Sequence, residues 1–332
     1  MNEAGARRDS PDPPAFAFEA RDSCPACGSA AETVYSTPFS EGPIGDFVRD
    51  YYHVDPAVLR EAPYELDRCR RCGLVYQHYV GGPELLGTLY SSWLEDPEDP
   101  ERDIATYRDE IRAIPESRDA HELMAAASYL GRPLAGLRTL DYGMGWVLWG
   151  RIAAQLGCDS FGSDLAQPRM DFAARHGVRT VTDSEIPGHR FDFINTEQVF
   201  EHVPQPLQLL ELLAAALAPG GVIKISVPSG ERIDRLLEIL KEGRFKGDRD
   251  TIMPVQPLEH LNCFRRSSIR TMAGLTGLEP VRPGPWHGYA FLRYPRTIRL
   301  SRPKKALKEL VRPVYQYRNP SNLYVWLRKP GG

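Results

Sequence analysis

Short apolar runs alternate with helical periodicity along the middle of the chain. The strand-like runs cover 137–141, 159–163, 178–182, 191–195 and 221–227. Between them lie runs with helical spacing, at 147–157, 167–176 and 205–218. Short strands separated by helices predict a parallel, doubly wound sheet, so we expect an α/β fold.

Further elements flank this alternating region. The segment 117–131 has helical periodicity, with Ser117 or Asp119 as its cap and Gly131 as its stop. Two more helices are predicted at 230–242 and 266–276. Two strand-like stretches, "LEPVRP" and "GYAFLRY", follow the second of these helices and are the last strands that we expect.

Shifts in composition divide the chain into four segments. The tail, 1–18, is rich in Pro, Asp and Arg and is predicted to be disordered. Residues 19–95 contain paired cysteines and lead into an acidic linker, "WLEDPEDPERD", before the alternating region within 96–295. Residues 296–332 are basic, and we interpret them as a solvated amphipathic helix, with a patch that binds phosphate groups or a membrane surface as the alternative.

Charge and hydropathy exclude several classes of protein. The net charge of −3, together with a Cys-bearing segment that is not strongly basic, argues against a nucleic-acid partner. No apolar run reaches the roughly 18–20 residues that a membrane span requires. The N-terminus lacks the apolar stretch of a secretory signal. We therefore expect a cytoplasmic protein, monomeric or homodimeric, that acts on a small molecule.

The stretch "LDYGMGW" has the form of a ligand-binding loop between a strand and a helix. Gly143 and Gly145 permit a close approach of the backbone to a ligand. Leu148 stands where a dinucleotide fingerprint needs its third glycine, and the Gly-Lys-Ser/Thr of a P-loop is missing. Asp141 before the glycines would repel a pyrophosphate but suits a cationic ligand such as S-adenosylmethionine.

Two further acids follow the next strands of the pattern. Asp164 ends the strand in "FGSDLA", where a carboxylate can accept both hydroxyls of a ribose, and Asp183 in "VTDSEIP" can face an adenine amine. Each acid alone has a helix cap as its alternative explanation. Acids at successive strand ends, followed by "FDFINTEQVFEHV" and the turn in "LAPGGVIKISVP", favour a common ligand site.

These motifs, with "PLEHLNCFRRSSIRTMAGLTGLE", resemble the class I S-adenosylmethionine-dependent methyltransferases over residues 137–295. The resemblance implies a seven-stranded Rossmann-like sheet with a final antiparallel strand, and a cofactor across the carboxyl ends of the first strands. The residues that it assigns to the cofactor are Asp141, Gly143, Gly145, Asp164, Leu165, Asp183, Ser184, Glu197 and Gln198.

Val147 departs from the family pattern, which usually has glycine at this position. We expect Val147 inside the first turn of the following helix, where its side chain would crowd the cofactor and require a modest repacking.

The motifs "CPACG" and "CRRCG" place Cys24 and Cys27, and Cys69 and Cys72, in two C-x-x-C-G pairs. In a chain without an export signal, such pairs favour a metal over disulfides, and four thiolates fit a tetrahedral zinc ion. The alternative is four unrelated buried cysteines. We expect a structural Zn²⁺ site in a small domain that precedes the methyltransferase sheet, because four thiolates leave no open position for catalysis.

A Cys-bearing domain before this sheet is similar to the zinc-binding C-methyltransferases of nucleotide-linked deoxysugars. That resemblance implies that "ELLGTLYSSWLED", with Tyr90 and Trp93, helps to form the substrate pocket. It implies C-methylation of a sugar, with O- or N-methylation of another specialised metabolite as the alternative. Methylation of RNA or protein by a macromolecule-binding enzyme is a further alternative.

Four residues are candidates for catalysis. Glu201 and His202 in "VFEHVPQP" follow the fourth strand, and a histidine there can take a proton near neutral pH. His260 in "PLEHLNCF" and Tyr90 are predicted at the substrate pocket. For each of them, a purely structural role is the alternative: a helix start for His202, and packing for His260 and Tyr90.

Overall fold

The computed structural model describes residues 15–94, 117–294, 303–315 and 321–331. Its strands are β1 (Phe18–Ala20), β2 (Ala31–Pro38), β3 (Pro63–Cys69), β4 (Val75–Gln77), β5 (Tyr79–Gly81), β6 (Arg138–Tyr142), β7 (Asp159–Ser163), β8 (Arg179–Thr180), β9 (Phe191–Glu197), β10 (Leu217–Pro228), β11 (Asn262–Cys263), β12 (Glu279–Val281) and β13 (Asn322–Arg328).

The α-helices are α1 (Gly42–Tyr52), α2 (Pro83–Thr88), α4 (Arg118–Leu130), α5 (Leu148–Gln155), α6 (Gln167–Arg175), α7 (Pro206–Ala216), α8 (Ile233–Lys241), α9 (Arg249–Ile252), α10 (Arg266–Leu275), α11 (Pro285–Gly288) and α12 (Pro303–Tyr315). Short 3₁₀ turns are η1 (Pro56–Leu59), η4 (Ile186–Gly188), η5 (Gly230–Arg232), η6 (Met253–Val255) and η7 (Ala290–Arg293), and η2 (Leu89–Trp93) is a π-helical turn. None of the described helices has both the length and the apolar character that a bilayer crossing requires.

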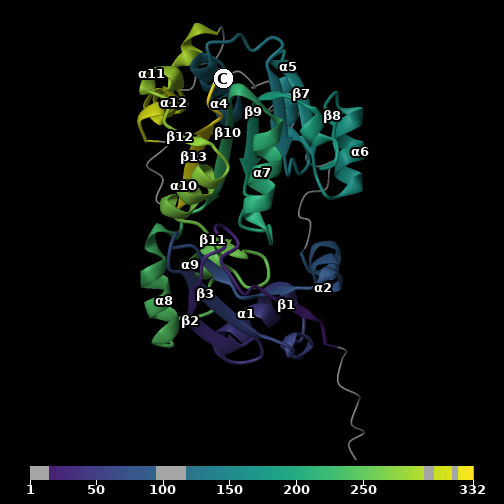
Figure 1. The fold of residues 1–332 in the computed structure, drawn as a ribbon, viewed down its shortest axis with the longest axis vertical. Helices are drawn as coiled ribbons and strands as arrows, with labels where there is room; N and C mark the ends of the chain where they lie inside the picture. The colour runs from purple at the N-terminus through teal and green to yellow at the C-terminus, as the bar shows by residue number, and fades with distance from the viewer. Residues whose placement is uncertain (1–14, 95–116, 295–302, 316–320, 332) are drawn as a thin grey trace, which may run out of the picture.

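The elements form two bodies stacked along the longest axis of the molecule (Figure 1). The large body contains the seven-stranded sheet, with strand order β12-β13-β10-β9-β6-β7-β8. Strands β10, β9, β6, β7 and β8 are parallel, and β13 runs antiparallel to both β10 and β12. This is the seven-stranded sheet with one antiparallel strand that the resemblance implies.

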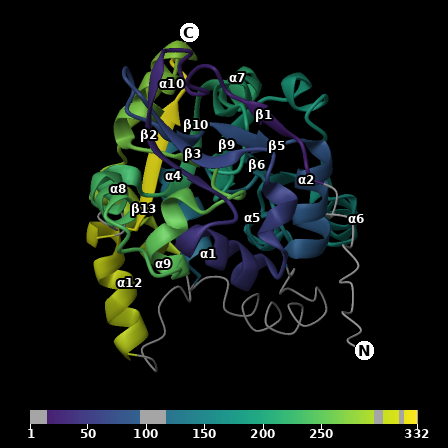
Figure 2. The same cartoon turned by 90° about the horizontal axis from the view of Figure 1, so that it is seen from below.

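Helices cover both faces of the large sheet. Leu123 of α4 and Trp149 of α5 pack against Phe193 on one face. Leu213 of α7 and Met272 of α10 lie in the core on the other face. The two edges of the body are well separated, since α12 lies at one side and α6 at the opposite side in both views (Figures 1 and 2).

Helix α4 begins and ends where the sequence predicts. The Ser117 side chain accepts a hydrogen bond from the amide of Ala120 at 3.1 Å, which caps the first turn. Gly131 ends the helix with a φ of 65°, in the left-handed region that glycine adopts at low cost.

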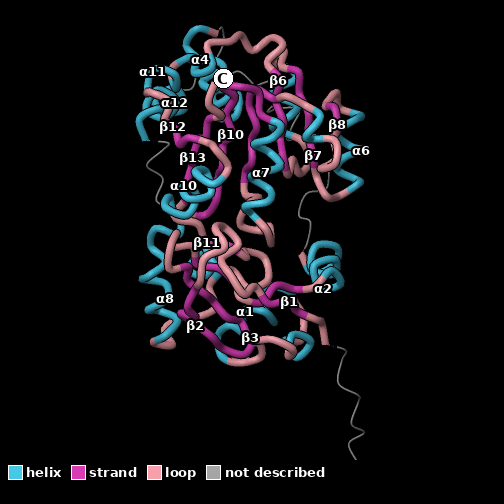
Figure 3. Tube along the Cα trace, viewed as in Figure 1, coloured by secondary structure: helices cyan, strands magenta, loops and turns pink. Residues whose placement is uncertain are grey.

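The small body is built from two distant parts of the chain. Its four-stranded sheet has the order β11-β4-β3-β2, so a strand from residues 262–263 completes a sheet that begins at residue 31. Its core likewise joins Leu59 and Tyr64 to Leu236 and Leu237 of α8. Loops collect between this sheet and the large body, around β11 (Figure 3).

Most predicted elements are found, but "GYAFLRY" is not a strand. It forms the end of α11 and the turn η7, where the consecutive residues Ala290 and Phe291 are both buried, a pattern that an alternating strand cannot give. The antiparallel strand is β13, from the segment expected as a basic extension. The predicted tail lies outside the described residues up to residue 14, and so does most of the linker after Leu94.

Candidate functional site

The loop after β6 is shaped by its two glycines. Gly143 and Gly145 have φ angles of 72° and 51°. The amide of Gly143 donates to the carbonyl of Ser163 at 2.8 Å, which holds the loop against the end of β7. A Cβ at Gly143 would lie 2.5 Å from Cγ2 of Val199, whereas a Cβ at Gly145 would meet no atom within 4 Å. Gly145 therefore borders the open side of the loop.

Asp164 at the end of β7 is tied to this loop. Its Oδ2 accepts a hydrogen bond from the amide of Gly145 and its Oδ1 one from the amide of Ala166, both at 3.0 Å. Arg169 approaches Oδ1 to 3.5 Å. Leu165, the next residue, is 98% exposed, so an apolar side chain lies uncovered beside the carboxylate. This combination suits a ligand with a hydroxyl-bearing and a flat apolar part.

The residues expected at the adenine end lie at the same edge of the sheet. The hydroxyl of Tyr142, the last residue of β6, donates to Oδ2 of Asp183 at 3.1 Å. Ser184 shares a 3.0 Å hydrogen bond with Thr182. Asp183 and Ser184 are both exposed, so their remaining hydrogen-bonding capacity faces solvent.

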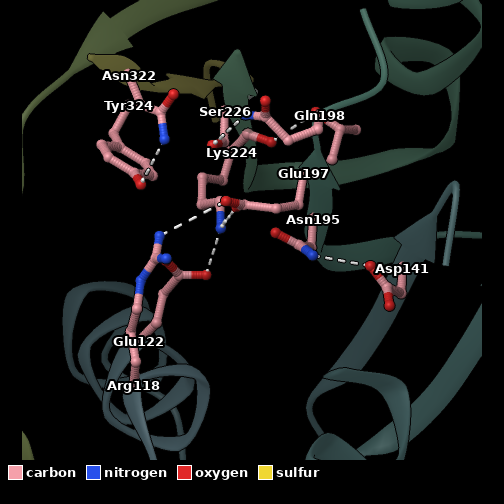
Figure 4. A network of polar contacts seen from close by, with 11 residues as sticks. Arg118, Glu122, Asp141, Asn195, Glu197, Gln198, Lys224, Ser226, Asn322 and Tyr324 are labelled. Atoms are coloured by element: carbon pink, nitrogen blue, oxygen red, sulfur yellow. Dashed lines mark hydrogen bonds and ion pairs between the residues drawn. The ribbon is translucent and has the colours of Figure 1, made fainter. Parts of the chain in front are cut away.

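Asp141 points into the large body beside β9. Its Oδ1 accepts a hydrogen bond from the Asn195 side chain at 2.8 Å, and the residue is only 4% exposed (Figure 4). Burial raises the pKa of Asp141 to about 7, against the opposing effects of the Asn195 hydrogen bond and of Lys224. A cationic group that bound here would favour the ionised carboxylate.

Glu197 and Gln198, which we expected at the cofactor pocket, are held by β10. Glu197 forms an ion pair with Lys224, with Nζ and Oε2 2.7 Å apart. The backbone amide of Gln198 donates a hydrogen bond to the carbonyl of Ser226 at 2.9 Å. Lys224 also contacts Glu122 of α4 at 2.7 Å, and Arg118 of α4 lies 3.6 Å from Glu197 (Figure 4). A buried charge network thus joins α4 to the end of β9.

Sequence reasoning did not identify Lys224, Glu122 and Arg118 as residues of this network. Burial would lower the pKa of Lys224, but the attraction of Glu122 and Glu197 outweighs it and holds the pKa above its usual value. The signal that could have revealed the network is the single charged residue in the apolar run "GVIKISV", because a lysine is rarely buried without a partner.

Three of the four catalytic candidates meet where the two bodies join. The rings of His202 and His260 have centroids 4.8 Å apart, and the hydroxyl of Tyr90 lies 3.4 Å from Nδ1 of His202. Tyr90 is 51% exposed, so about half of its surface faces solvent. Trp93, which the resemblance places at the substrate pocket, contacts Phe16 in the small body, with ring centroids 5.5 Å apart.

Both histidines are held in one tautomer by backbone carbonyls. Nδ1 of His202 lies 3.0 Å from the carbonyl oxygen of Glu259, and Nδ1 of His260 bonds to the carbonyl of Met253. A carbonyl oxygen can only accept, so each Nδ1 carries a proton and each Nε2 has a free lone pair. Burial lowers the pKa of His202 to about 4 and that of His260 to about 3, so both rings are neutral at pH 7.

Glu201, the fourth candidate, is buried beside these rings. It is 1% exposed, and neither carboxylate oxygen has a hydrogen-bond partner within the part of the chain that the structure describes. Burial raises its pKa well above the usual value. The backbone around it is fixed, because the Glu201 carbonyl accepts from the amide of Asn262 at 3.1 Å, and the Asn262 side chain donates to the carbonyls of Phe200 and Val203.

Val147 lies before α5, not within its first turn as expected. It occupies the N-cap position with a φ of 66°. Its side chain is fully buried and packs with Met170, Phe172 and Val178. The expectation that it crowds the cofactor is therefore wrong, since the side chain fills the space beneath α6.

The four paired cysteines come together at the junction of the bodies. Sγ of Cys24 lies 3.6 Å from that of Cys72, and Sγ of Cys27 lies 3.5 Å from that of Cys69. All four sulfur atoms lie within 4.8 Å of one another. Zn–S bonds of about 2.3 Å in a tetrahedron place sulfur atoms about 3.8 Å apart, so the cluster fits that ion.

The two cysteine turns repeat one backbone geometry. The amide of Gly28 donates to the carbonyl of Cys24 at 2.8 Å, and that of Gly73 donates to the carbonyl of Cys69 at 3.1 Å. Both glycines have positive φ angles. Ser267 of α10 donates to the carbonyl of Cys72 at 2.9 Å, which ties the cluster to the large body.

Comparison with protein families gives one assignment for the large body. A family model described as a methyltransferase domain matches residues 107–282, which is more than half of the chain. The chain is also similar to curated proteins with a methyltransferase name. It is 35% identical over 104 residues to a ubiquinone biosynthesis O-methyltransferase of Cereibacter sphaeroides, covering 28% of this chain and 42% of that protein.

A protein of the same name from Vibrio cholerae is 25% identical over 165 residues, covering 44% of this chain and 65% of the relative. The chain thus spans less than two thirds of the length of these curated relatives. Among solved structures, the plantazolicin methyltransferase BamL, in complex with a triazolic desmethylPZN analog and SAH, is 14% identical, with a TM-score of 0.45 over 74% of this chain and 94% of BamL. The magnesium protoporphyrin IX methyltransferase of Synechocystis, also with SAH, is 15% identical, with a TM-score of 0.38 over 68% of this chain and 94% of that protein.

Proposed function

This chain belongs to the S-adenosylmethionine-dependent methyltransferases through its methyltransferase domain, and from that premise we propose that it methylates a small-molecule acceptor where its two bodies meet. One contact carries the proposal. Val199 lies against Gly143, because a Cβ at Gly143 would be 2.5 Å from its Cγ2. Val199 is also in the same loop as His202, since the backbone amide of His202 donates to the Val199 carbonyl at 3.0 Å. The cofactor loop and the histidine pair are therefore adjacent.

On the cofactor side, we propose that Asp164 binds the ribose hydroxyls and that Leu165 supports the adenine ring. Asp183 and Ser184 would bind the polar edge of that ring. Asp141, Gly143 and Gly145 would surround the methionine part, where the buried carboxylate favours an ammonium group. Bound S-adenosylmethionine supplies a methyl group on a sulfonium that is already reactive, so most of the acceleration comes from positioning the acceptor.

On the acceptor side, we propose that His202 and His260 handle the proton that the acceptor loses. Their Nε2 atoms are unprotonated, because both rings are neutral and carry their proton on Nδ1. Tyr90 extends from the small body beside His202 and can position an acceptor oxygen by a hydrogen bond. Glu201 adds a carboxylate behind the two rings.

We propose that the four cysteines hold a structural Zn²⁺. The ion would stabilise a small sheet that two distant chain segments build, and would fix it against α10 through Cys72 and Ser267. Metal analysis should find one zinc per chain, retained in Cys158→Ser and lost in Cys69→Ser. An equal zinc content in both variants would exclude this site.

For the acceptor, we propose a nucleotide-linked sugar that is methylated on carbon, with O- or N-methylation of another specialised metabolite as the second candidate. The Cys-bearing body before the methyltransferase sheet supports the first. The second is favoured by the name of the curated relatives, which are O-methyltransferases. Methylation of RNA or protein is the weakest alternative, since the net charge is −3.

Calorimetry with S-adenosylmethionine tests the cofactor assignment. We expect Asp164→Ala to lose at least tenfold in affinity, and Asp171→Ala, an exposed carboxylate on α6, to bind normally. Equal affinity of both variants would refute the assignment. A mass-spectrometric screen of nucleotide sugars and phenols for a methyl gain then separates the acceptor classes, and methylation of neither would refute both.

A further inference from the structure

Glu201, His202 and His260 bring one carboxylate and two imidazoles to one point. A carboxylate oxygen of Glu201 and one ring nitrogen of each histidine all lie within 4.8 Å of one another. The carboxylate is buried, and neither of its oxygens has a hydrogen-bond partner among the described residues. Buried carboxylates normally have partners, so an unbonded one beside two neutral imidazole rings is suited to a positively charged ligand.

The histidines are oriented as metal ligands usually are. A metal-bound histidine donates its other ring N–H to a carbonyl or carboxylate, which fixes the tautomer and the direction of the ring. His202 and His260 both do this, to the carbonyls of Glu259 and Met253. Neither Nε2 atom has a hydrogen-bond partner among the residues that the structure describes. Backbone hydrogen bonds hold the supporting loop, because the amide of His260 donates to the carbonyl of Gln256 at 3.0 Å.

We propose that Glu201, His202 and His260 bind a divalent transition-metal ion through one carboxylate oxygen and two Nε2 atoms. Two imidazoles with one carboxylate suit Zn²⁺, Fe²⁺ or Co²⁺ better than Mg²⁺. Bonds of about 2.0–2.2 Å require the three ligand atoms to lie roughly 3 Å apart, so the side chains would move inward on binding.

A second cluster of carboxylates with a histidine lies in the small body, and its Asp67 is not left without hydrogen bonds. Asp67 accepts hydrogen bonds from Thr33 at 2.9 Å and from His78 at 2.7 Å, so its carboxylate is already satisfied. Glu65, Asp67 and His78 also lie within reach of one another, but both carboxylates are on one strand and His78 is paired internally. This cluster provides a matched control.

The ion would define the class of acceptor. Three protein ligands leave open positions, which two adjacent oxygen atoms of one acceptor can fill, as in a vicinal diol, a hydroxyketone or a catechol. The ion would then lower the pKa of a bound hydroxyl, whose proton would pass to water. The two histidines would thus promote loss of this proton through the ion that they hold. This part rests on the proposed function, whereas binding of the ion itself does not.

Cobalt titration of the full chain, first loaded with one equivalent of Zn²⁺, tests the site. We expect one Co²⁺ to bind with the absorption of nitrogen and oxygen ligands, without the intense bands that thiolate ligands give. Glu201→Gln should weaken this binding by about 10–100-fold, and Glu65→Gln should not change it. If Glu201→Gln fails to fold, His260→Gln should show the same loss.

Binding of Co²⁺ with equal affinity by wild type and by these variants would overturn the proposal, and so would the absence of any ion beyond the zinc. Calorimetry with S-adenosylmethionine on the same samples separates the two proposals. A chain that binds Co²⁺ at this site but no S-adenosylmethionine would retain the metal site and refute the proposed function. The reverse result would refute the metal site alone.

Discussion

Lys224 Nζ lies 2.7 Å from Oε1 of Glu122 and 2.7 Å from Oε2 of Glu197. The lysine side chain is only 3% exposed, and it joins helix α4 to the end of β9 through two carboxylates. Removal of the cation leaves two partly buried carboxylates that repel each other, and among the described residues only Glu197 keeps a cationic partner, Arg118 at 3.6 Å. These two contacts therefore fix α4 near the carboxyl ends of the central strands, where the cofactor is proposed to bind.

We predict that Lys224→Met lowers the free energy of unfolding by about 3–5 kcal/mol, because it leaves uncompensated buried charge. Urea unfolding of the wild type, Lys224→Met, Glu122→Gln and the double variant gives the coupling between the two residues. The double variant should lose less than the sum of the single losses. Additive losses would show that the ion pair contributes nothing beyond its two separate side chains.

The two glycines of the cofactor loop give a second prediction. Both have positive φ angles, so alanine costs about 1–2 kcal/mol at either position. At Gly143 the new methyl group would also meet Val199, whereas at Gly145 it would enter open space. Gly143→Ala should therefore lose more stability than Gly145→Ala in thermal unfolding without ligand.

The affinity for S-adenosylmethionine should distinguish these two glycine variants in a different way from stability. If the open side of Gly145 holds the cofactor, Gly145→Ala weakens S-adenosylmethionine at least tenfold although the protein remains folded. Calorimetry on the purified variants measures this. An unchanged affinity would place the cofactor away from Gly145.

The order of elements in the large body was predictable because its parallel strands are local apolar runs. The run 159–163 matches β7 residue for residue, and the acids Asp141 and Asp164 correctly mark the ends of neighbouring strands. In contrast, β13 pairs between β10 and β12, about a hundred residues after β10 begins. No local pattern specifies such a distant pairing, so "NLYVWLR" was assigned to an extension.

The site was predictable in its residue types but not in their partners. The spacing of the cysteines predicted one cluster, and all four sulfur atoms meet. The pairing of β11 with β4 of the small body brings Glu201, His202 and His260 together. It determines that Glu201 is left without a hydrogen bond among the described residues while carbonyls hold the two histidines. This contact is tertiary. Val147 shows the same limit, since its burial depends on α6 and its positive φ on the loop.

The strained position of Val147 gives a third prediction. A side chain at a φ of 66° costs about 1–2 kcal/mol, and burial of the valine offsets that cost. Val147→Ala removes buried methyl groups but keeps the strain. Val147→Gly removes the whole side chain but also relieves the strain. We expect both to destabilise by about 1–3 kcal/mol, with glycine no worse than alanine. Urea unfolding measures the free energies of unfolding of the two variants. A much larger loss of stability in Val147→Gly than in Val147→Ala would contradict the role of strain.

Asp141 gives a prediction about pH. Burial raises its pKa to about 7, above the value of about 3.9 in an unfolded chain. The folded protein therefore binds this proton more tightly, so the group's contribution to stability is full below pH 4 and is lost as the pH rises toward 7. Ligand affinity follows the opposite direction, because a cationic cofactor requires the ionised carboxylate.

We expect the affinity for S-adenosylmethionine to rise about tenfold between pH 6 and pH 8, since the ionised fraction of Asp141 rises from about 9% to about 91%. Asp141→Asn keeps an oxygen that can accept from Asn195 but cannot ionise. It should bind more weakly at pH 8 and lose this part of the pH dependence. The ligand's own titration is the same in both proteins, so it cancels in the comparison. Calorimetry at pH 6, 7 and 8 measures the affinity of the wild type and of Asp141→Asn. Parallel pH profiles of the two proteins would show that Asp141 does not contact the cationic part of the cofactor.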